Sequence, residues 1–146
     1  MLSRFCGLRH LVVGAVLMMQ AEVGKKILAQ KGDSDAGSLS VVMQTLFDIS
    51  KVVNVPPGGF FPPPKVDSIV LKLVPRDSGL GEREEVFLSF VRAGFKQPRK
   101  TIVNNLQSRF PKDRVGDTLE RLALPTTVRP HQLGRDAWID LFNSLQ

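Results

Sequence analysis

The run from Phe60 to Ser68 has the residue types that could hold an unpaired nucleobase. It reads Phe-Phe-Pro-Pro-Pro-Lys-Val-Asp-Ser. Because proline has a fixed φ and no N–H donor, the three prolines stiffen this run and keep it out of a sheet interior. A ring held in this way loses little entropy on stacking, which contributes about 1 to 3 kcal/mol per base, and Lys65 could bind a phosphate. The alternative is that both phenylalanines fill a seam in the core, which is the commoner fate of this residue.

A second candidate surface is the basic stretch from residue 92 to residue 114. It contains seven basic residues and one acidic residue, a local net charge of +6 that equals the charge of the whole chain. The basic residues are Arg92, Lys96, Arg99, Lys100, Arg109, Lys112 and Arg114. Clustered charges of one sign repel each other and need a counter-charge, which a nucleic-acid backbone supplies. The alternative is a solvated helix face.

Several other chemistries are excluded by composition. The single cysteine, Cys6, cannot form an internal disulfide, and the two histidines, His10 and His131, lack the spacing of a zinc site. The sequence pI of about 9.9 favours phosphate-rich partners or anionic membrane surfaces. A reducing, cytosol-like compartment follows from the cysteine count.

The amino-terminal part of the chain reads as the end of an α/β sheet. The apolar run from Leu11 to Met19 predicts a strand buried on both faces. Residues 21–30 follow as a short helix, and residues 31–38 form a loop of turn formers. A secretory signal is the alternative for the apolar run, but no small-residue cleavage site follows it. Its nine residues are also too few for a helix to cross a bilayer.

Two further strands flank the proline-rich run. Residues 39–47 have apolar residues at helical spacing, whereas residues 48–55 are rich in β-branched residues and predict a strand. After the prolines, the segment from Val66 to Val74 places Ile69, Leu71 and Leu73 on one face of a strand. Turn formers from residue 75 to residue 81 then mark a boundary.

Beyond this boundary the apolar residues recur every three or four positions, as amphipathic helices require. This spacing is found over residues 86–95, 115–122 and 137–145, and residues 101–108 predict a shorter helix. The carboxyl-terminal part is therefore expected to be all helical. The sequence as a whole predicts an α+β fold in two domains, residues 1–76 and residues 77–146.

The run from Val55 to Ser68 resembles the signature loop of the small-subunit ribosomal RNA adenine N6,N6-dimethyltransferases. Other pieces resemble the same family and occur in the family's order along nearly the whole chain. They are Met19-Gln20-Ala21-Glu22-Val23, Leu39-Ser40-Val41, Phe95-Lys96-Gln97-Pro98-Arg99-Lys100-Thr101 with Asn104-Asn105-Leu106, and Arg129-Pro130 with Gln132-Leu133. Ordered matches of this kind are far more specific than one proline-rich loop.

The resemblance implies an enzyme that transfers methyl groups from S-adenosylmethionine to adenines of small-subunit ribosomal RNA, the expected partner. It also implies that residues 1–76 are the last strands and helices of a Rossmann-like methyltransferase domain, and that residues 77–146 are a helical rRNA-docking domain. Phe60 matches the family's phenylalanine that packs on the flipped target base. Phe61 falls at a position that varies in the family. Lys65 and the seven basic residues of the 92–114 stretch are the candidate RNA-binding residues.

Two parts of the family's pattern are not found. The donor site needs a glycine-rich loop after a strand, but after Gly79-Leu80-Gly81 a glutamate, Glu84, stands where the third glycine belongs. The family's Asn-Leu-Pro-Tyr motif is missing, and the chain has no tyrosine. Ala21 and Ser38 stand where the family usually has lysine and arginine. We therefore expect a fragment that is inactive alone and binds no S-adenosylmethionine by itself.

Two other functions fit the same residues. One is a non-catalytic RNA-binding or ribosome-assembly factor that kept the docking surface, and the other is a relative of the mitochondrial B-type transcription factors. The expected compartment is the cytoplasm, with the mitochondrion or another organelle as the alternative. We expect neither a membrane nor a metal partner. We do expect self-association, because the other strands of the sheet are not in this chain and strand edges would be exposed.

Overall fold

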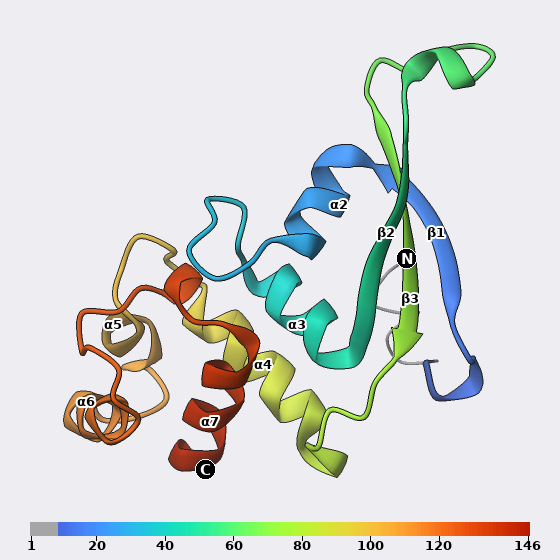
Figure 1. Ribbon diagram of the computed structural model, residues 1–146. Coiled ribbons are helices and arrows are strands. Elements are labelled where there is room, and N and C mark those ends of the chain that lie inside the picture. The colour runs from blue at the N-terminus through green and yellow to red at the C-terminus, as the bar shows by residue number, and fades with distance from the viewer. Residues whose placement is uncertain (1–8) are drawn as a thin grey trace.

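The computed structural model describes residues 9–146, which form a three-stranded sheet beside a group of helices (Figure 1). A short 3-10 turn, η1 (Arg9–Leu11), precedes the first strand. The strands are β1 (Ala15–Gln20), β2 (Phe47–Val55) and β3 (Ser68–Pro75). Their order in the sheet is β1-β3-β2, and both neighbouring pairs are antiparallel. The last strand of the chain therefore lies between the two earlier ones.

The central strand β3 shows the predicted alternation. Ile69, Leu71 and Leu73 are all buried on one face, which confirms the assignment made from their spacing. Two helices, α2 (Ala21–Leu28) and α3 (Ser38–Leu46), cover this face (Figure 1). Burial of this apolar face against the helices holds the sheet and helices together.

The prediction for the first strand is wrong in part. The strand begins at Ala15 instead of Leu11, and its residues alternate between half-buried and exposed instead of being buried on both faces. Val16 is 64% exposed and Met18 is 55% exposed. Within residues 9–146, α2 and α3 cover only one face of the sheet, so the other face of β1 meets no packing partner.

The carboxyl-terminal part is helical, as the three-to-four-residue spacing predicted. It consists of α4 (Glu84–Gly94), α5 (Ile102–Leu106), α6 (Lys112–Arg121) and α7 (Arg135–Leu145), with short 3-10 turns η3 (Gly81–Arg83) and η4 (Pro130–Gln132). Aromatic rings fill its core, where Phe90 contacts Trp138 edge to face with ring centroids 5.9 Å apart.

Helix α3 joins the two parts. Val41 belongs to the hydrophobic cluster of the helical part, whereas Met43 and Leu46 belong to the cluster beneath the sheet. Since one helix contributes to both clusters, the sheet and the helical part share a packed boundary. The division into domains at residue 76 stays a prediction.

Two remaining expectations concern membranes and metals. In the described part of the chain, no helix has the length and apolar character needed to span a bilayer. Residues 9–146 also contain no group of three or more metal-ligating side chains of the His, Cys, Asp or Glu type. Cys6 lies outside the described residues.

Candidate nucleic-acid interface

The proline-rich run forms the loop between β2 and β3, which projects beyond the body of the sheet (Figure 1). The loop begins with a 3-10 turn, η2 (Pro57–Gly59), in which the Phe60 N–H donates to the Pro57 carbonyl at 3.2 Å. At its other end the Asp67 carbonyl accepts from the Ala21 N–H at 2.9 Å. The loop is therefore tied to the point where β1 ends and α2 begins.

The two phenylalanines of this loop have different surroundings. Phe60, the predicted target-base residue, is half-buried, whereas Phe61 is fully exposed at 100%. The side chain of Lys65 is also exposed. The sequence offered no means of ranking the two rings by exposure, because exposure depends on how the loop sits over the sheet.

The basic residues of the 92–114 stretch lie on the helical part and are exposed. Arg92 lies on α4, and Lys96, Arg99 and Lys100 lie on the loop from residue 95 to residue 101, which connects α4 to α5. Within the described part of the chain, the side chains of Lys96, Arg99 and Lys100 form no hydrogen bond or ion pair. Their charges are therefore available to an external anion.

The remaining cations of the stretch are differently placed. The Arg109 guanidinium donates to the Ser89 hydroxyl at 2.7 Å. The Arg114 guanidinium donates to the Leu145 carbonyl at 2.9 Å and lies 5.8 Å from the centroid of the Phe110 ring. Lys112 begins α6 and is exposed. Arg109 and Arg114 thus have structural contacts in addition to any contact with RNA.

The loop over residues 95–101, called the cationic loop below, is held in place by a buried amide that the sequence did not point to. Asn105 is only 6% exposed, and its side-chain oxygen accepts from the Gln97 N–H at 2.8 Å. Its amide nitrogen lies 3.0, 3.3 and 3.1 Å from the carbonyl oxygens of Gln97, Lys100 and Thr101. One side chain therefore fixes both ends of the segment that carries Arg99 and Lys100. The signal in the sequence was a polar residue on the inward face of a short helix.

The structure does not bring all the candidate residues together. Lys65 lies on the β2–β3 loop, whereas the other candidate cations lie on the helical part, on the opposite side of the molecule in Figure 1. Helix α2 and the loop over residues 29–37 lie between them in this view. An RNA that contacts both regions must therefore extend across the molecule.

A cleft of about 510 Å³ opens between the sheet and the beginning of α7. Three cations line it, Lys31, Arg76 and Arg135, together with the carboxylates of Asp48 and Asp136. Arg76 forms an ion pair with Asp48, and Arg135 lies 3.4 Å from Asp136. Two of the three cations are thus paired with carboxylates, which makes this cleft a weaker anion site than the loop held by Asn105.

Among residues 9–146, the resolved pKa shifts belong to one surface pair on α2. Lys26 donates a hydrogen bond to Glu22 at 2.8 Å. This bond, together with the opposite charges, lowers the pKa of Glu22 and raises the pKa of Lys26. Both groups are solvated, so the pair supports the helix surface and indicates no acid–base chemistry.

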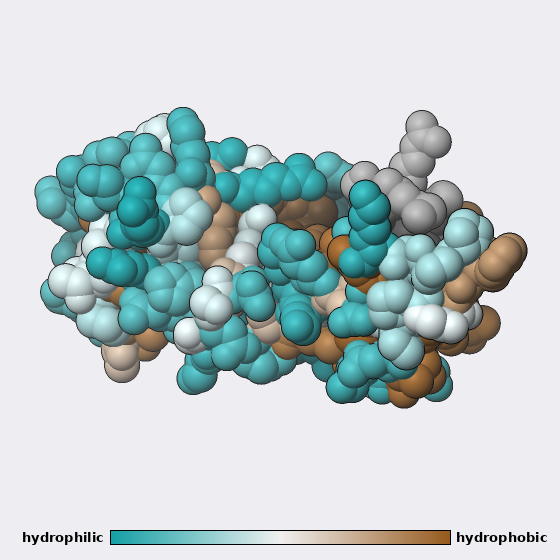
Figure 2. Space-filling model, turned by 90° about the horizontal axis from the view of Figure 1, so that it is seen from above, coloured by the Kyte–Doolittle hydropathy of each residue, from teal (hydrophilic) through white to brown (hydrophobic). Residues whose placement is uncertain are grey.

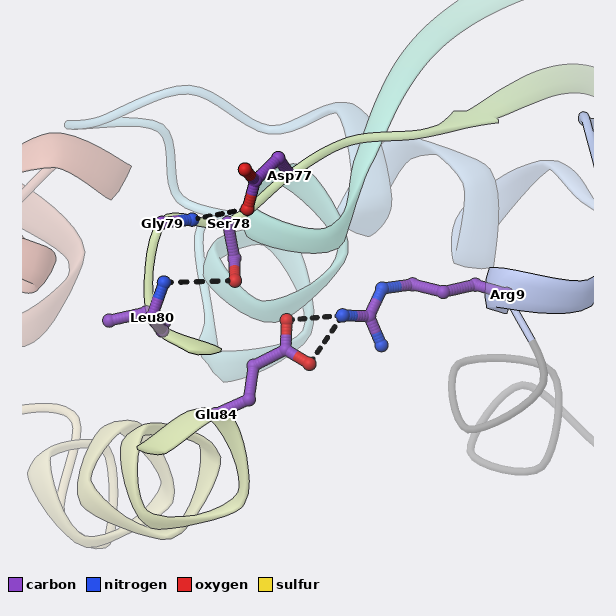
Figure 3. A network of polar contacts seen from close by, with 6 residues as sticks. All are labelled: Arg9, Asp77, Ser78, Gly79, Leu80 and Glu84. Atoms are coloured by element: carbon purple, nitrogen blue, oxygen red, sulfur yellow. Dashed lines mark hydrogen bonds and ion pairs between the residues drawn. The ribbon is translucent and has the colours of Figure 1, made fainter. Parts of the chain in front are cut away.

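The glycine-containing turn after β3 does not fit a methyl donor. Gly79 and Gly81 have φ of +70° and +55°, but the N–H groups of Gly79 and Leu80 are bonded to side chains of the same turn (Figure 3). The Asp77 carboxylate accepts from the Gly79 N–H at 2.9 Å, and the Ser78 hydroxyl accepts from the Leu80 N–H at 3.3 Å.

The glutamate in place of the third glycine also has a structural role. Glu84 begins α4 and forms an ion pair with Arg9, as Figure 3 shows. This pair connects the segment before β1 to the start of the helical part. The turn is therefore a structural link between the two parts, and we assign it no cofactor.

Comparison with known proteins identifies the family to which the chain belongs. The family model for ribosomal RNA adenine dimethylase matches residues 2–146. The chain therefore belongs to the ribosomal RNA adenine dimethylase family. This confirms the resemblance drawn from the loop and its flanking motifs.

Individual relatives agree with the family. The chain is 38% identical over 127 residues to ribosomal RNA small subunit methyltransferase A of Sulfurimonas denitrificans, covering 87% of this chain and 46% of that protein. It is 40% identical over 139 residues to the protein of the same name from Bacillus cytotoxicus, covering 92% of this chain and 47% of that protein. The chain thus spans about half the length of the curated relatives it matches.

Two solved structures confirm the α+β methyltransferase-type fold. A dimethyladenosine transferase from Plasmodium falciparum matches with a TM-score of 0.80 and 29% identity, covering 96% of this chain and 60% of that one. The 23S rRNA methyltransferase ErmE matches with a TM-score of 0.69 and 26% identity, covering 99% of this chain and 59% of that one.

Proposed function

We propose that this chain is the RNA-docking part of a ribosomal RNA adenine dimethyltransferase and that it binds small-subunit ribosomal RNA. The observation that carries the proposal is the loop over residues 95–101. Its three cations are exposed, have no partner in the described part of the chain, and are held in place by the buried Asn105 amide. A fixed group of unpaired cations on a member of this family is suited to bind the phosphates of its RNA.

The residues have separate roles in this proposal. Lys96, Arg99 and Lys100 bind backbone phosphates, together with the other candidate cations of the helical part. Phe60 packs on the target adenine after it leaves the helical stack, which costs a few kcal/mol of unstacking. Stacking on the ring returns about 1 to 3 kcal/mol of this cost. Lys65 holds a phosphate beside that base.

The methyl donor has no residues of this chain assigned to it. S-adenosylmethionine supplies the methyl group in methyltransferases of this kind. Since the N–H groups of Gly79 and Leu80 are bonded to side chains of their own turn, the proposal gives this turn no part in holding the donor and gives residues 9–146 the binding and orientation of RNA.

A filter-binding titration against small-subunit ribosomal RNA at several salt concentrations tests the proposal. We expect log K to fall linearly with log salt, by about 0.7 per phosphate neutralised if the contacts are to single strands. Replacing Lys96, Arg99 and Lys100 together by glutamine should weaken binding and reduce the magnitude of the slope by about 2.

The matched control replaces Lys25, Lys31 and Lys51 by glutamine. These residues are also exposed and the change removes the same charge, but they lie outside the proposed surface. Equal losses in the two triple variants would contradict a localised docking surface, and salt-insensitive or absent binding would reject RNA docking altogether.

A second candidate function is a non-catalytic RNA-binding or ribosome-assembly factor. The observation that favours it is the turn at Gly79, which does not suit a donor. Methyl transfer from labelled S-adenosylmethionine to small-subunit ribosomal RNA separates the two candidates. Transfer of label by this chain would reject the non-catalytic candidate. RNA binding without transfer would favour it, provided that transfer is also absent when the part of a longer relative that this chain does not match is added.

A further inference from the structure

Phe61 differs from every other aromatic residue in the described part of the chain. It is 100% exposed, whereas the core rings of Phe87, Phe90, Phe142 and Trp138 are at most 1% exposed. The remaining described aromatic residues are buried or half-buried. A single exposed apolar side chain is common at protein surfaces. Phe61 stands out because its exposed side chain is an aromatic ring on a proline-rich loop that also carries the exposed Lys65.

The loop holds this ring away from the body of the protein. Pro62, Pro63 and Pro64 follow Phe61 directly, and their fixed φ angles restrict the backbone from folding the ring back onto the sheet. No ring contact or cation contact of Phe61 is found among residues 9–146. A ring that is already held outward loses little entropy when a flat partner covers it.

The backbone directs the side chains of Phe60 and Phe61 to different sides of the loop. Phe60 has φ of −128° and ψ of 155°, which is extended backbone. In extended backbone successive side chains point to opposite sides, which agrees with Phe60 half-buried and Phe61 exposed. The two side chains therefore leave the loop backbone in different directions.

The surroundings of the ring favour a nucleobase over an apolar protein pocket. Lys65 is exposed a few residues away on the same loop, where it can bind the phosphate of a nucleotide. Of the exposed aliphatic residues, Val66 lies on this loop and is 48% exposed, whereas Val16 and Met18 lie on β1. One small aliphatic side chain gives a protein pocket less apolar surface to bind than the ring itself does. A single fixed ring next to a cation is the arrangement that binds single-stranded nucleic acid by stacking.

We propose that Phe61 stacks on an unpaired base of the bound RNA that is distinct from the base assigned to Phe60. The proposal rests on the proposed function, since it requires RNA to be present at the β2–β3 loop. It adds a second base contact and makes the protein selective for RNA that is unpaired at two positions near this loop.

Two substitutions and two RNAs test this contact. Phe61→Ala removes the ring, and Phe61→Leu keeps an apolar side chain without a π face. With a single-stranded RNA that contains adenines, we expect both variants to bind about tenfold more weakly in filter binding. With the fully paired duplex of the same sequence, both should bind within about twofold of the unsubstituted chain, because a paired base offers no free face.

A spectroscopic variant reports stacking directly. In Phe61→Trp the introduced indole lies on the surface, whereas the chain's own Trp138 is fully buried and gives a constant background. We expect the single-stranded RNA to quench the surface indole and the duplex to leave it unchanged. Val86→Ala, which trims an exposed side chain on α4, is the control and should bind as the unsubstituted chain does.

The outcomes separate this contact from the proposed function. If the unsubstituted chain binds RNA with the expected salt dependence but Phe61→Ala binds equally well, the stacking contact is rejected and RNA docking stands. If Phe61→Leu binds like the unsubstituted chain while Phe61→Ala does not, an apolar pocket covers the residue and stacking is rejected. If no RNA binds at all, both proposals fail.

Discussion

At the scale of single residues, Asn105 links stability to the proposed function. Its side chain forms hydrogen bonds to the backbone of Gln97, Lys100 and Thr101, which are the groups that shape the cationic loop. Because the amide is buried, a residue without polar atoms would leave these backbone groups without a partner. The same change would release Arg99 and Lys100 from their fixed positions.

We expect Asn105→Ala to lower the free energy of unfolding by about 2 to 3 kcal/mol, since several hydrogen bonds are lost at a buried site. RNA affinity should fall as well, although no charge is removed. Urea denaturation measures the first effect, and filter binding measures the second. Asn104→Ala is the matched control, because Asn104 is exposed, and should change stability by no more than about 0.5 kcal/mol. Equal unfolding midpoints for the two variants would show that Asn105 does not support the loop.

At the scale of elements, α4 and α7 pack closely because of a glycine. A Cβ atom placed on Gly94 would lie 2.3 Å from Cη2 and 2.7 Å from Cζ3 of Trp138. The indole is fully buried and is in contact with Phe90 and Phe95, so it has little space to move. The position of the cationic loop depends on this contact, because the loop starts where α4 ends.

We expect Gly94→Ala to destabilise the protein by about 1 to 3 kcal/mol, because overpacking outweighs the higher helix propensity of alanine. Gly116→Ala on α6 is the control, since its Cβ would meet only the Thr126 methyl group at 3.9 Å. That variant should be neutral or more stable by up to about 1 kcal/mol. Thermal unfolding gives both values, and a Gly94→Ala melting temperature at or above that of the unsubstituted chain would contradict this account of the packing.

At the scale of the whole molecule, hydrophobic surface gathers at the end that carries the sheet, whereas the helical end is mostly hydrophilic in this view (Figure 2). Val16, Met18, Val52 and Val53 are exposed side chains of the sheet. Among residues 9–146, β1 pairs only with β3, so its outer edge has no strand beside it. An uncharged strand edge next to an apolar face promotes association between chains.

We expect the isolated chain to form dimers or larger species as its concentration rises, measured by sedimentation equilibrium. Replacing Val16 and Met18 together by lysine should shift the protein toward monomer, because charges on this face oppose its burial in an interface. Val86→Lys places a charge on the helical part and should leave the association unchanged. A monomer at all concentrations would indicate that another arrangement protects the sheet.

Local patterns were sufficient to predict much of the fold. The alternation of Ile69, Leu71 and Leu73 predicted the buried face of β3, since a strand places every second side chain on one side. The three-to-four-residue spacing after residue 81 predicted the helices, and the prolines predicted a loop outside the sheet. The ordered motifs predicted the family, which the comparisons confirmed.

By itself, the sequence determined the type of each main element and the membership of the family. Only the tertiary structure decided that β3 lies between β1 and β2, that β1 is covered on one face, and that Phe61 is exposed while Phe60 is half-buried. It also decided that the Asn105 side chain bonds to the backbone of Gln97, eight residues earlier in the chain. Periodicity is set by neighbouring residues and can be read locally, whereas burial and hydrogen-bond partners depend on which distant elements pack together.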